Sequence, residues 1–278
     1  MPSASTIEST MNIVFPGNFI QANIFSALLC ILVPVLFLWY YKKRTGVKAG
    51  AFFVGAAFCL LFSFLVTYLV NILVLSVFGL GSFFSSQTHP VYSAIYGSCS
   101  IGLISTLGMY VGLKYAMKNR PGRENALVFG VGIGGLECIL NGATVYITNL
   151  IAAFLINSVG SAEYFKKLGL TGKELTETRK LFADQAATPA SYFLMDATYM
   201  ILSLILSASI TLLIYRAIHK KESCLFPVAI VLQILGYAPM YLTHIAAFEN
   251  SFILFGIATI YVFAVAFFAY RLYHDIDQ

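Results

Sequence analysis

The stretch FGVGIGGLECIL, residues 129–140, combines four glycines and one carboxylate, Glu137, in an otherwise apolar run. Glycines at this spacing are typical of a transmembrane helix that packs closely against another helix, because they let two backbones approach. The predicted packing face consists of Gly130, Gly132, Gly134 and Gly135. A carboxylate at the bilayer centre costs about 2.5–3.5 kcal/mol or more. Glu137 is therefore expected to face the interior of a helical bundle.

The composition of the whole chain agrees with a membrane location. Of its 278 residues, 59% are hydrophobic and only 10% are charged, and the mean hydropathy is +0.83. One soluble core of this size cannot bury so much apolar surface. Apolar stretches of about 20 residues, separated by short polar loops, predict an all-α polytopic transmembrane bundle. The sequence thus predicts a multi-pass cell-membrane protein surrounded by the lipid bilayer.

Seven spans are predicted in a single transmembrane domain, 19–278, which follows an N-terminal tail and interfacial segment, 1–18. Their approximate bounds are 19–41, 50–79, 91–117, 126–157, 191–215, 225–246 and 251–271. Twelve of the 17 Lys and Arg residues fall on alternate loops or span ends, and hence on one face of the membrane. The positive-inside rule then predicts an outside N-terminus and a cytoplasmic C-terminus. Because the basic residues sort by loop, the net charge of +5 does not indicate nucleic-acid binding.

Two local features are predicted around the fourth span. At about 32 residues it would be about 48 Å long, so it must tilt strongly or break, and Asn141-Gly142 is the predicted break. The loop after it predicts an extracytoplasmic amphipathic helix at about 161–187. A capping box is expected there from Thr171 and Glu174. Its apolar positions, expected on the membrane surface or over the bundle, are Leu175, Leu181 and Phe182.

A polar layer is expected inside the bundle at the depth of Glu137. Counting residues from the span ends places the following side chains at a similar depth: Ser105, Thr106, Gln233 and Asn141. This layer has two interpretations. It is either a hydrogen-bonded knot in which a neutral Glu137 bonds to Gln233 or a hydroxyl, or part of an active site. The residues alone favour the knot.

The residue types near this layer do not predict catalysis. Zinc catalysis needs about three protein ligands and an open position. The histidines His89, His219, His244 and His274 lie in loops, at a span end or in the tail, and no HExxH motif is present. No His or Lys lies near the serines to act as a base for a nucleophile. The residues alone therefore predict no metal and no enzyme.

The chain nevertheless resembles a known family. The segments GVGIGGLECILNG (130–142) and TNLIAAFLIN (148–157) resemble the glycine-rich core of the YhfC family. These are bacterial intramembrane metalloproteases, related to the CAAX-processing and bacteriocin-processing (CPBP) membrane endopeptidases. The resemblance implies a Glu and His site that binds a divalent metal, zinc in the first instance, and activates water for peptide cleavage.

Most residues of that family site are replaced here. In GLISTLGMY (102–110) the family carries a Glu-Glu pair and an Arg, where this chain has Ser105, Thr106 and Met109. A His that precedes the Gly-Gly pair in the family corresponds to Ile133. In VLQILGYAPMYL (231–242) Gln233 and Tyr237 take the places of a His and an Asp. Glu137 matches the surviving carboxylate.

Three functional hypotheses follow. The leading one is a YhfC-like protein that has lost proteolysis and binds a membrane peptide or protein, with no cofactor. The second is an active protease with an atypical site, in which Glu137 is the base or a ligand, His244 or Asp196 is recruited, and zinc is the cofactor. The third is a small-solute or proton-coupled transporter, suggested by a lone buried carboxylate. The substrate and the oligomeric state are not predicted.

Overall fold

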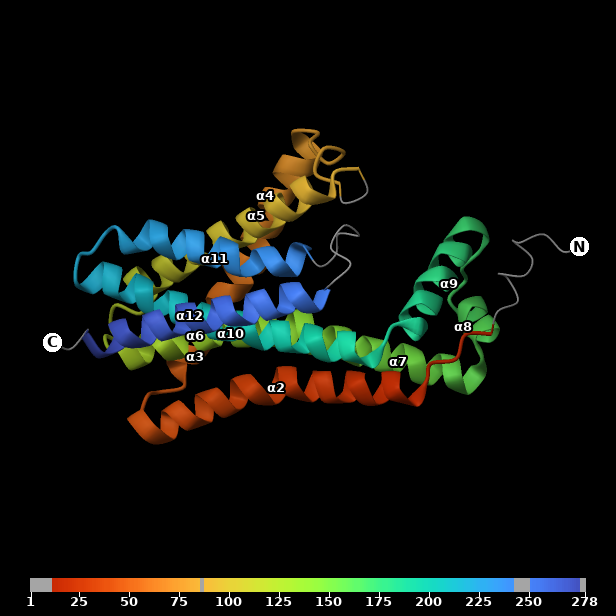
Figure 1. Cartoon of the computed structure of the whole chain (residues 1–278), viewed down its shortest axis with the longest axis horizontal. Helices are drawn as coiled ribbons and strands as arrows, with labels where there is room; N and C mark the ends of the chain where they lie inside the picture. The colour runs from red at the N-terminus through yellow and green to blue at the C-terminus, as the bar shows by residue number, and fades with distance from the viewer. Residues whose placement is uncertain (1–11, 86–87, 243–250, 276–278) are drawn as a thin grey trace, which may run out of the picture. The chain divides into compact units, whose positions relative to one another are not determined.

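The computed structural model describes residues 12–85, 88–242 and 251–275, and these residues are helical with short connections and no strand (Figure 1). The elements in chain order are α2 (Gly17–Thr45), α3 (Gly50–Phe58), η1 (Cys59–Val66), α4 (Thr67–Asn71), η2 (Ile72–Val77), α5 (Pro90–Val111), η3 (Gly112–Ala116), α6 (Arg123–Glu137), η4 (Cys138–Ala143), α7 (Thr144–Val159), α8 (Ser161–Lys167), α9 (Gly172–Ala187), α10 (Ala190–His219), α11 (Leu225–Leu242) and α12 (Ser251–Asp275). The elements labelled η are π-helical segments that continue neighbouring α-helices.

The predicted number of membrane spans is confirmed. Within the described residues, seven helical segments are long and apolar enough to cross a bilayer. They are Gly17–Thr45, Gly50–Val77, Pro90–Ala116, Arg123–Val159, Ala190–His219, Leu225–Leu242 and Phe252–Tyr273. The placement of the N-terminus outside and the C-terminus in the cytoplasm stays a prediction from loop charge.

The fourth span is longer than expected, and it does not break at Asn141-Gly142. The segment Arg123–Val159 contains 37 residues, which at 1.5 Å per residue corresponds to about 56 Å. The helix changes instead to π-helical geometry over η4, Cys138–Ala143, and returns to an α-helix at Thr144. A π-helical turn accommodates an irregularity without exposing backbone groups to lipid, which a true break would do.

The chain divides into two compact units. Unit 1 comprises residues 1–29 and 140–197, and unit 2 comprises residues 30–139 and 198–278. In unit 1 the extended segment before α2 is tied to the end of α7 by side-chain amides. The backbone N–H of Phe15 donates to Asn157 Oδ1 and Asn157 Nδ2 donates to the Phe15 carbonyl, both at 2.8 Å. Ser161 Oγ accepts from the backbone N–H of Ile13 at 3.2 Å.

The predicted loop helix consists of two helices, α8 and α9, both in unit 1. Thr171 precedes α9 with an extended backbone, as expected of an N-cap residue, but its side chain makes no capping hydrogen bond. The predicted capping box is therefore wrong in its side-chain detail. Phe182 of α9 packs against the ring of Phe165, with 5.7 Å between centroids, while Leu181 is exposed.

In unit 2, glycines allow neighbouring helices to pack with their backbones in contact. α3 packs against α6, and α5 packs against α11. A Cβ added to Gly55 of α3 would lie 2.0 Å from the Phe129 carbonyl oxygen, and one added to Gly132 of α6 would lie 2.1 Å from the Phe52 carbonyl oxygen. The two backbones meet at a distance that only glycine permits. This contact fixes the part of α6 that leads to Glu137.

Candidate functional site

Glu137 is the last residue of α6, and its side chain is 4% exposed. Within unit 2, Gly130, Gly134 and Gly135 bring the preceding turns against two further helices, α10 and α2. Added Cβ atoms would collide with Ala208 and Thr211 of α10 at Gly130, with Leu204 of α10 at Gly134, and with Pro34 of α2 at Gly135. The face that carries Gly130 and Gly134 thus lies against α10. The glycines therefore set how deeply the Glu137 carboxyl is enclosed.

The partners of the Glu137 carboxyl are hydroxyl groups. The Tyr237 hydroxyl of α11 donates to Glu137 Oε2 at 2.8 Å. The Ser203 hydroxyl of α10 donates to the same oxygen at 3.3 Å. Ser63 of η1 is also buried and lies close enough to the carboxyl to interact with it. Helices α6, α10 and α11 thus meet at one carboxyl oxygen.

The predicted polar layer is buried but only partly connected. Thr106 Oγ1 donates to the Gly102 carbonyl of its own helix at 2.7 Å. Ser105 and Gln233 are 2% and 0% exposed, and neither side chain bonds to Glu137. Asn141 is exposed. The sequence predicts that Glu137 donates to Gln233 or to a hydroxyl of this layer, whereas in the structure Glu137 accepts from Tyr237 and Ser203 and does not bond to Gln233.

Several buried polar atoms of this region have no hydrogen-bond partner in the described part of the chain. They are Glu137 Oε1, Ser105 Oγ and both polar atoms of the Gln233 amide. Ser105 and Gln233 lie on antiparallel helices at similar heights, because Gly97 meets Tyr241 and Gly102 meets Ile234. Buried polar atoms without partners are uncommon and mark places where a further polar group can bind.

The remaining positions with family counterparts are apolar and buried. Met109 of α5 is 0% exposed and Ile133 of α6 is 2% exposed. Neither side chain carries an ionisable group, so neither supplies the charge or the ligand of its family counterpart. The space beside Tyr237 and Ser203 is small, a cavity of about 10 Å³ that includes Gly236 and Leu206 in its wall. That volume accommodates about one water molecule.

The sequence did not predict the roles of Ser203 and Ser63. A signal was present for Ser203, because Ser203, Ser207 and Thr211 are spaced four residues apart and form a polar stripe along one side of α10. Ser63 lies four residues after Cys59, and both are buried. Depth counted from charged loops identified residues at the correct height but not which of them face Glu137.

Comparisons with known proteins identify the family of this chain. A family model described as YhfC intramembrane metalloprotease matches residues 29–258. The chain belongs to this family. A curated relative, "Uncharacterized membrane protein YhfC" of Bacillus subtilis (strain 168), is 26% identical to this YhfC-family chain over 234 residues. The alignment covers 83% of this chain and 88% of the relative. No solved structure matches.

The family description implies a metal, so the side chains around Glu137 can be tested against one. Zinc is bound by Cys, His and carboxylate ligands, and a catalytic site uses about three of them. The oxygen of Glu137 is bonded to a phenol and a serine hydroxyl. Among residues 12–85, 88–242 and 251–275, no three His, Cys, Asp or Glu side chains gather closely enough to hold a metal ion. This set of donors does not fit zinc.

The sequence offered His244 or Asp196 for recruitment to this carboxyl. His89 and His219 have exposed side chains, away from the buried carboxyl. His244 lies outside the described residues, as does the side chain of His274. Asp196 belongs to unit 1 and Glu137 to unit 2, and Asp196 has an interaction of its own.

Proposed function

We propose that this YhfC-family protein does not cleave peptides, and that it acts in the membrane by binding a peptide or protein partner. The observation that carries the proposal is the bonding of Glu137. Its carboxyl is held by Tyr237 and Ser203 beside a cavity of about 10 Å³. Hydroxyl groups do not replace imidazole ligands for a metal, and the enclosed space is too small for a peptide and an attacking water.

The packing around the carboxyl supports a binding role for the bundle as a whole. Gly132 and Gly55 keep α6 and α3 in backbone contact, so these two helices are closely packed next to the site. The unpartnered amide of Gln233 and Oε1 of Glu137 offer a donor and acceptors.

Metal analysis and a cleavage assay test the proposal together. The full chain, purified without chelators and dialysed against zinc, is expected to retain much less than one zinc per chain. Glu137→Gln is expected to retain the same amount as the wild type. No membrane peptide should be cleaved by either protein. Stoichiometric zinc in the wild type, lost in Glu137→Gln, would contradict the proposal.

A second function, an active protease with an atypical site, is favoured by one observation. Glu137 Oε1 is buried and has no hydrogen-bond partner among the described residues. A general base needs an oxygen that is not already hydrogen-bonded, so that it can accept a proton from water. Cleavage of a membrane peptide by the wild type, reduced at least a hundredfold in Glu137→Gln with folding unchanged, would establish this alternative.

A further inference from the structure

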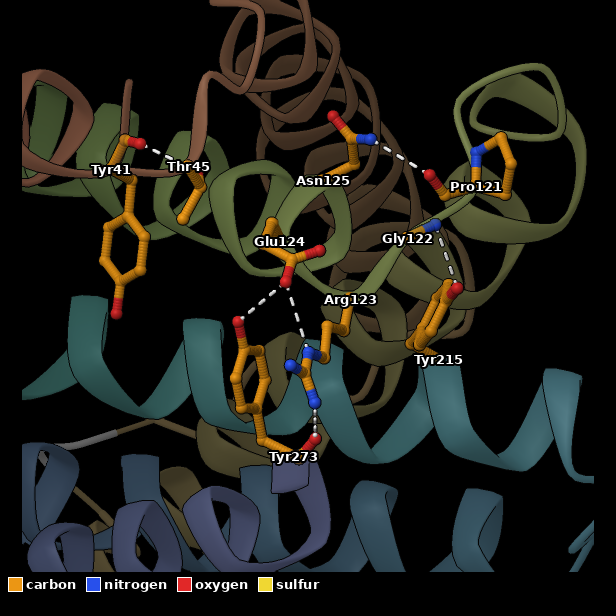
Figure 2. Close-up of polar contacts among 9 residues, drawn as sticks. All are labelled: Tyr41, Thr45, Pro121, Gly122, Arg123, Glu124, Asn125, Tyr215 and Tyr273. Carbon is orange, nitrogen blue, oxygen red and sulfur yellow. Dashed lines mark hydrogen bonds and ion pairs between the residues drawn. The ribbon is translucent and has the colours of Figure 1, made fainter. Parts of the chain in front are cut away.

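A second polar cluster of unit 2 lies at the start of α6, at the end of the bundle that carries the basic residues. Figure 2 shows the Arg123 side chain between Glu124 and Tyr273. Arg123 Nε bonds to Glu124 Oε1 at 3.1 Å, and its NH1 donates to the Tyr273 carbonyl at 2.7 Å. The Tyr273 hydroxyl donates to the same Glu124 oxygen at 3.1 Å. The charge of Glu124 is therefore balanced by Arg123.

This cluster forms one edge of a cavity of about 600 Å³ in unit 2. The polar side of its lining includes Tyr40, Tyr41, Arg44, Arg123, Glu124 and Tyr273. Arg44 forms no ion pair among the described residues. Its guanidinium lies over the Tyr40 ring, 5.7 Å from the centroid, and donates to the Tyr40 hydroxyl. Since Arg123 and Glu124 neutralise each other, Arg44 leaves the polar side with a net positive charge.

The other side of the cavity is apolar and lies deeper along the same helices. Its lining includes Phe37, Leu127, Ile205, Leu212 and Ala266. At a rise of 1.5 Å per residue, Ile205 lies about 21 Å along the axis of α10 from its end at His219. Ala266 lies about 10 Å along the axis of α12 from Tyr273. The cavity therefore changes from cationic and phenolic at the membrane surface to hydrocarbon-like toward the bilayer centre.

We propose that this cavity binds one anionic phospholipid of the bilayer, with its phosphate at Arg44 and the hydroxyls of Tyr40 and Tyr41, and with the start of an acyl chain against the apolar wall. A volume of 600 Å³ lies in the range of small-molecule sites. Arginine with neighbouring hydroxyl donors suits a phosphodiester, and tyrosine is enriched where headgroups meet hydrocarbon. The gradient from charge to hydrocarbon matches an amphiphile and does not match a soluble anion.

Native mass spectrometry of the full chain in detergent tests this proposal. The probes are short-chain phosphatidylglycerol, phosphatidylcholine with the same acyl chains, and inorganic phosphate. One phosphatidylglycerol per chain is expected to bind, at least fivefold tighter than phosphatidylcholine, and inorganic phosphate is not expected to displace it. Equal binding of the two lipids, or displacement by inorganic phosphate, would overturn the lipid assignment.

Two variants of the lining, each with a matched control, locate the site. Arg44→Gln is expected to weaken phosphatidylglycerol binding about fivefold, the effect of one cation at an anionic headgroup. Arg271→Gln, at an exposed arginine of the same end that does not line the cavity, should change it less than twofold. Ala266→Phe fills the apolar side and is expected to remove the bound lipid.

The control for the added volume is Ala264→Phe, at an exposed position of α12 that is not in the lining. Thermal unfolding of all four variants shows whether they are folded. If Arg44→Gln and Ala266→Phe bind lipid as their controls do, the cavity is not the site. The outcome is independent of the zinc measurements on Glu137, because none of the four substitutions touches that carboxyl.

Discussion

Helix α6 carries two carboxyls in contrasting surroundings. Glu124 lies in its first turn and Glu137 is its last residue, about 20 Å further along the helix. Each accepts a hydrogen bond from a tyrosine hydroxyl, Tyr273 for Glu124 at 3.1 Å and Tyr237 for Glu137 at 2.8 Å. The difference is the cation: Arg123 lies 3.1 Å from Glu124, whereas the partners of Glu137 are uncharged hydroxyls.

The contrast shows how depth decides the way in which a carboxyl is stabilised. Near the end of a span, an arginine can pair with a carboxylate while keeping contact with the interface. Deep in the bundle a second charge would also have to be desolvated, so hydroxyl groups are the less costly partners. A buried carboxylate in a membrane helix is therefore not by itself a sign of catalysis. Four predictions test this difference, in order of decreasing effect.

The largest effect is expected at Gly132, which lies on α6 between the two carboxyls. Gly132→Leu is expected to destabilise the protein by about 3 kcal/mol or to prevent folding, because a Cβ would lie 2.1 Å from the Phe52 carbonyl oxygen. Thermal unfolding in detergent measures this effect. Gly256→Leu in α12 is the control, since nothing lies within 4 Å of a Cβ there. Equal stability of the two variants would mean that the α3 contact does not fix α6.

Removing the Tyr237 hydroxyl that bonds to Glu137 should have the next largest effect on stability. Tyr237→Phe is expected to lower the free energy of unfolding by about 1–3 kcal/mol, because it leaves a buried carboxyl oxygen with fewer donors. Tyr241→Phe, one turn later on α11, is the control and should change stability by less than half of that. The double variant Glu137→Gln, Tyr237→Phe should be less destabilised than the sum of the single variants. Simple additivity would show that the two side chains are not coupled.

Arg123, the cation beside Glu124, is expected to contribute less to stability than Tyr237 does. Arg123→Gln should lower stability by about 1 kcal/mol, because the pair is only partly buried and solvent screens it. The loss should shrink as salt concentration rises, whereas that of Tyr237→Phe should not. Unfolding at low and high salt distinguishes the two carboxyls. A larger effect for Arg123→Gln than for Tyr237→Phe would reverse the proposed order.

A third carboxyl, Glu222, also pairs with an arginine but lies in a loop. Its substitution should change stability least. Arg216 bonds to Glu222 at 3.0 and 3.1 Å and holds the pKa of that carboxyl below its ordinary value. The resulting stabilisation is present above the ordinary glutamate pKa and is lost as pH falls through the lowered value in the folded protein. Unfolding of the wild type and Glu222→Gln should therefore differ slightly at neutral pH and converge in acid. A difference that grows in acid would contradict this sign.

The sequence predicts the fold well because its signals are local. Apolar length identifies the seven spans, and the glycine spacing identifies the side of α6 on which Gly130 and Gly134 meet α10. Local signals fail where tertiary contacts decide. The long fourth span changes to π-helical geometry over η4 and does not break at Asn141-Gly142, since a π-helical turn keeps its backbone groups bonded.

The candidate site was predictable only in part. The resemblance to the YhfC family singled out Tyr237 as a replaced position, and the structure brings it to Glu137. Ser203 was missed, because a serine in an apolar helix often bonds to its own backbone and gives no sign of facing another helix. On the basis of depth alone, the sequence offered Gln233 or a hydroxyl group as the partner of Glu137. Depth fixes height in the bundle but not rotation about the helix axis.

The paired contacts at Gly55 and Gly132 also have a consequence for biosynthesis. Each glycine faces a carbonyl of the opposite helix, so the seam between α3 and α6 requires both backbones to be in place. The chain is made from its N-terminus, and α3 belongs to the second span and α6 to the fourth. Gly55 of the second span therefore stays uncovered in the membrane until the third and fourth spans have been inserted.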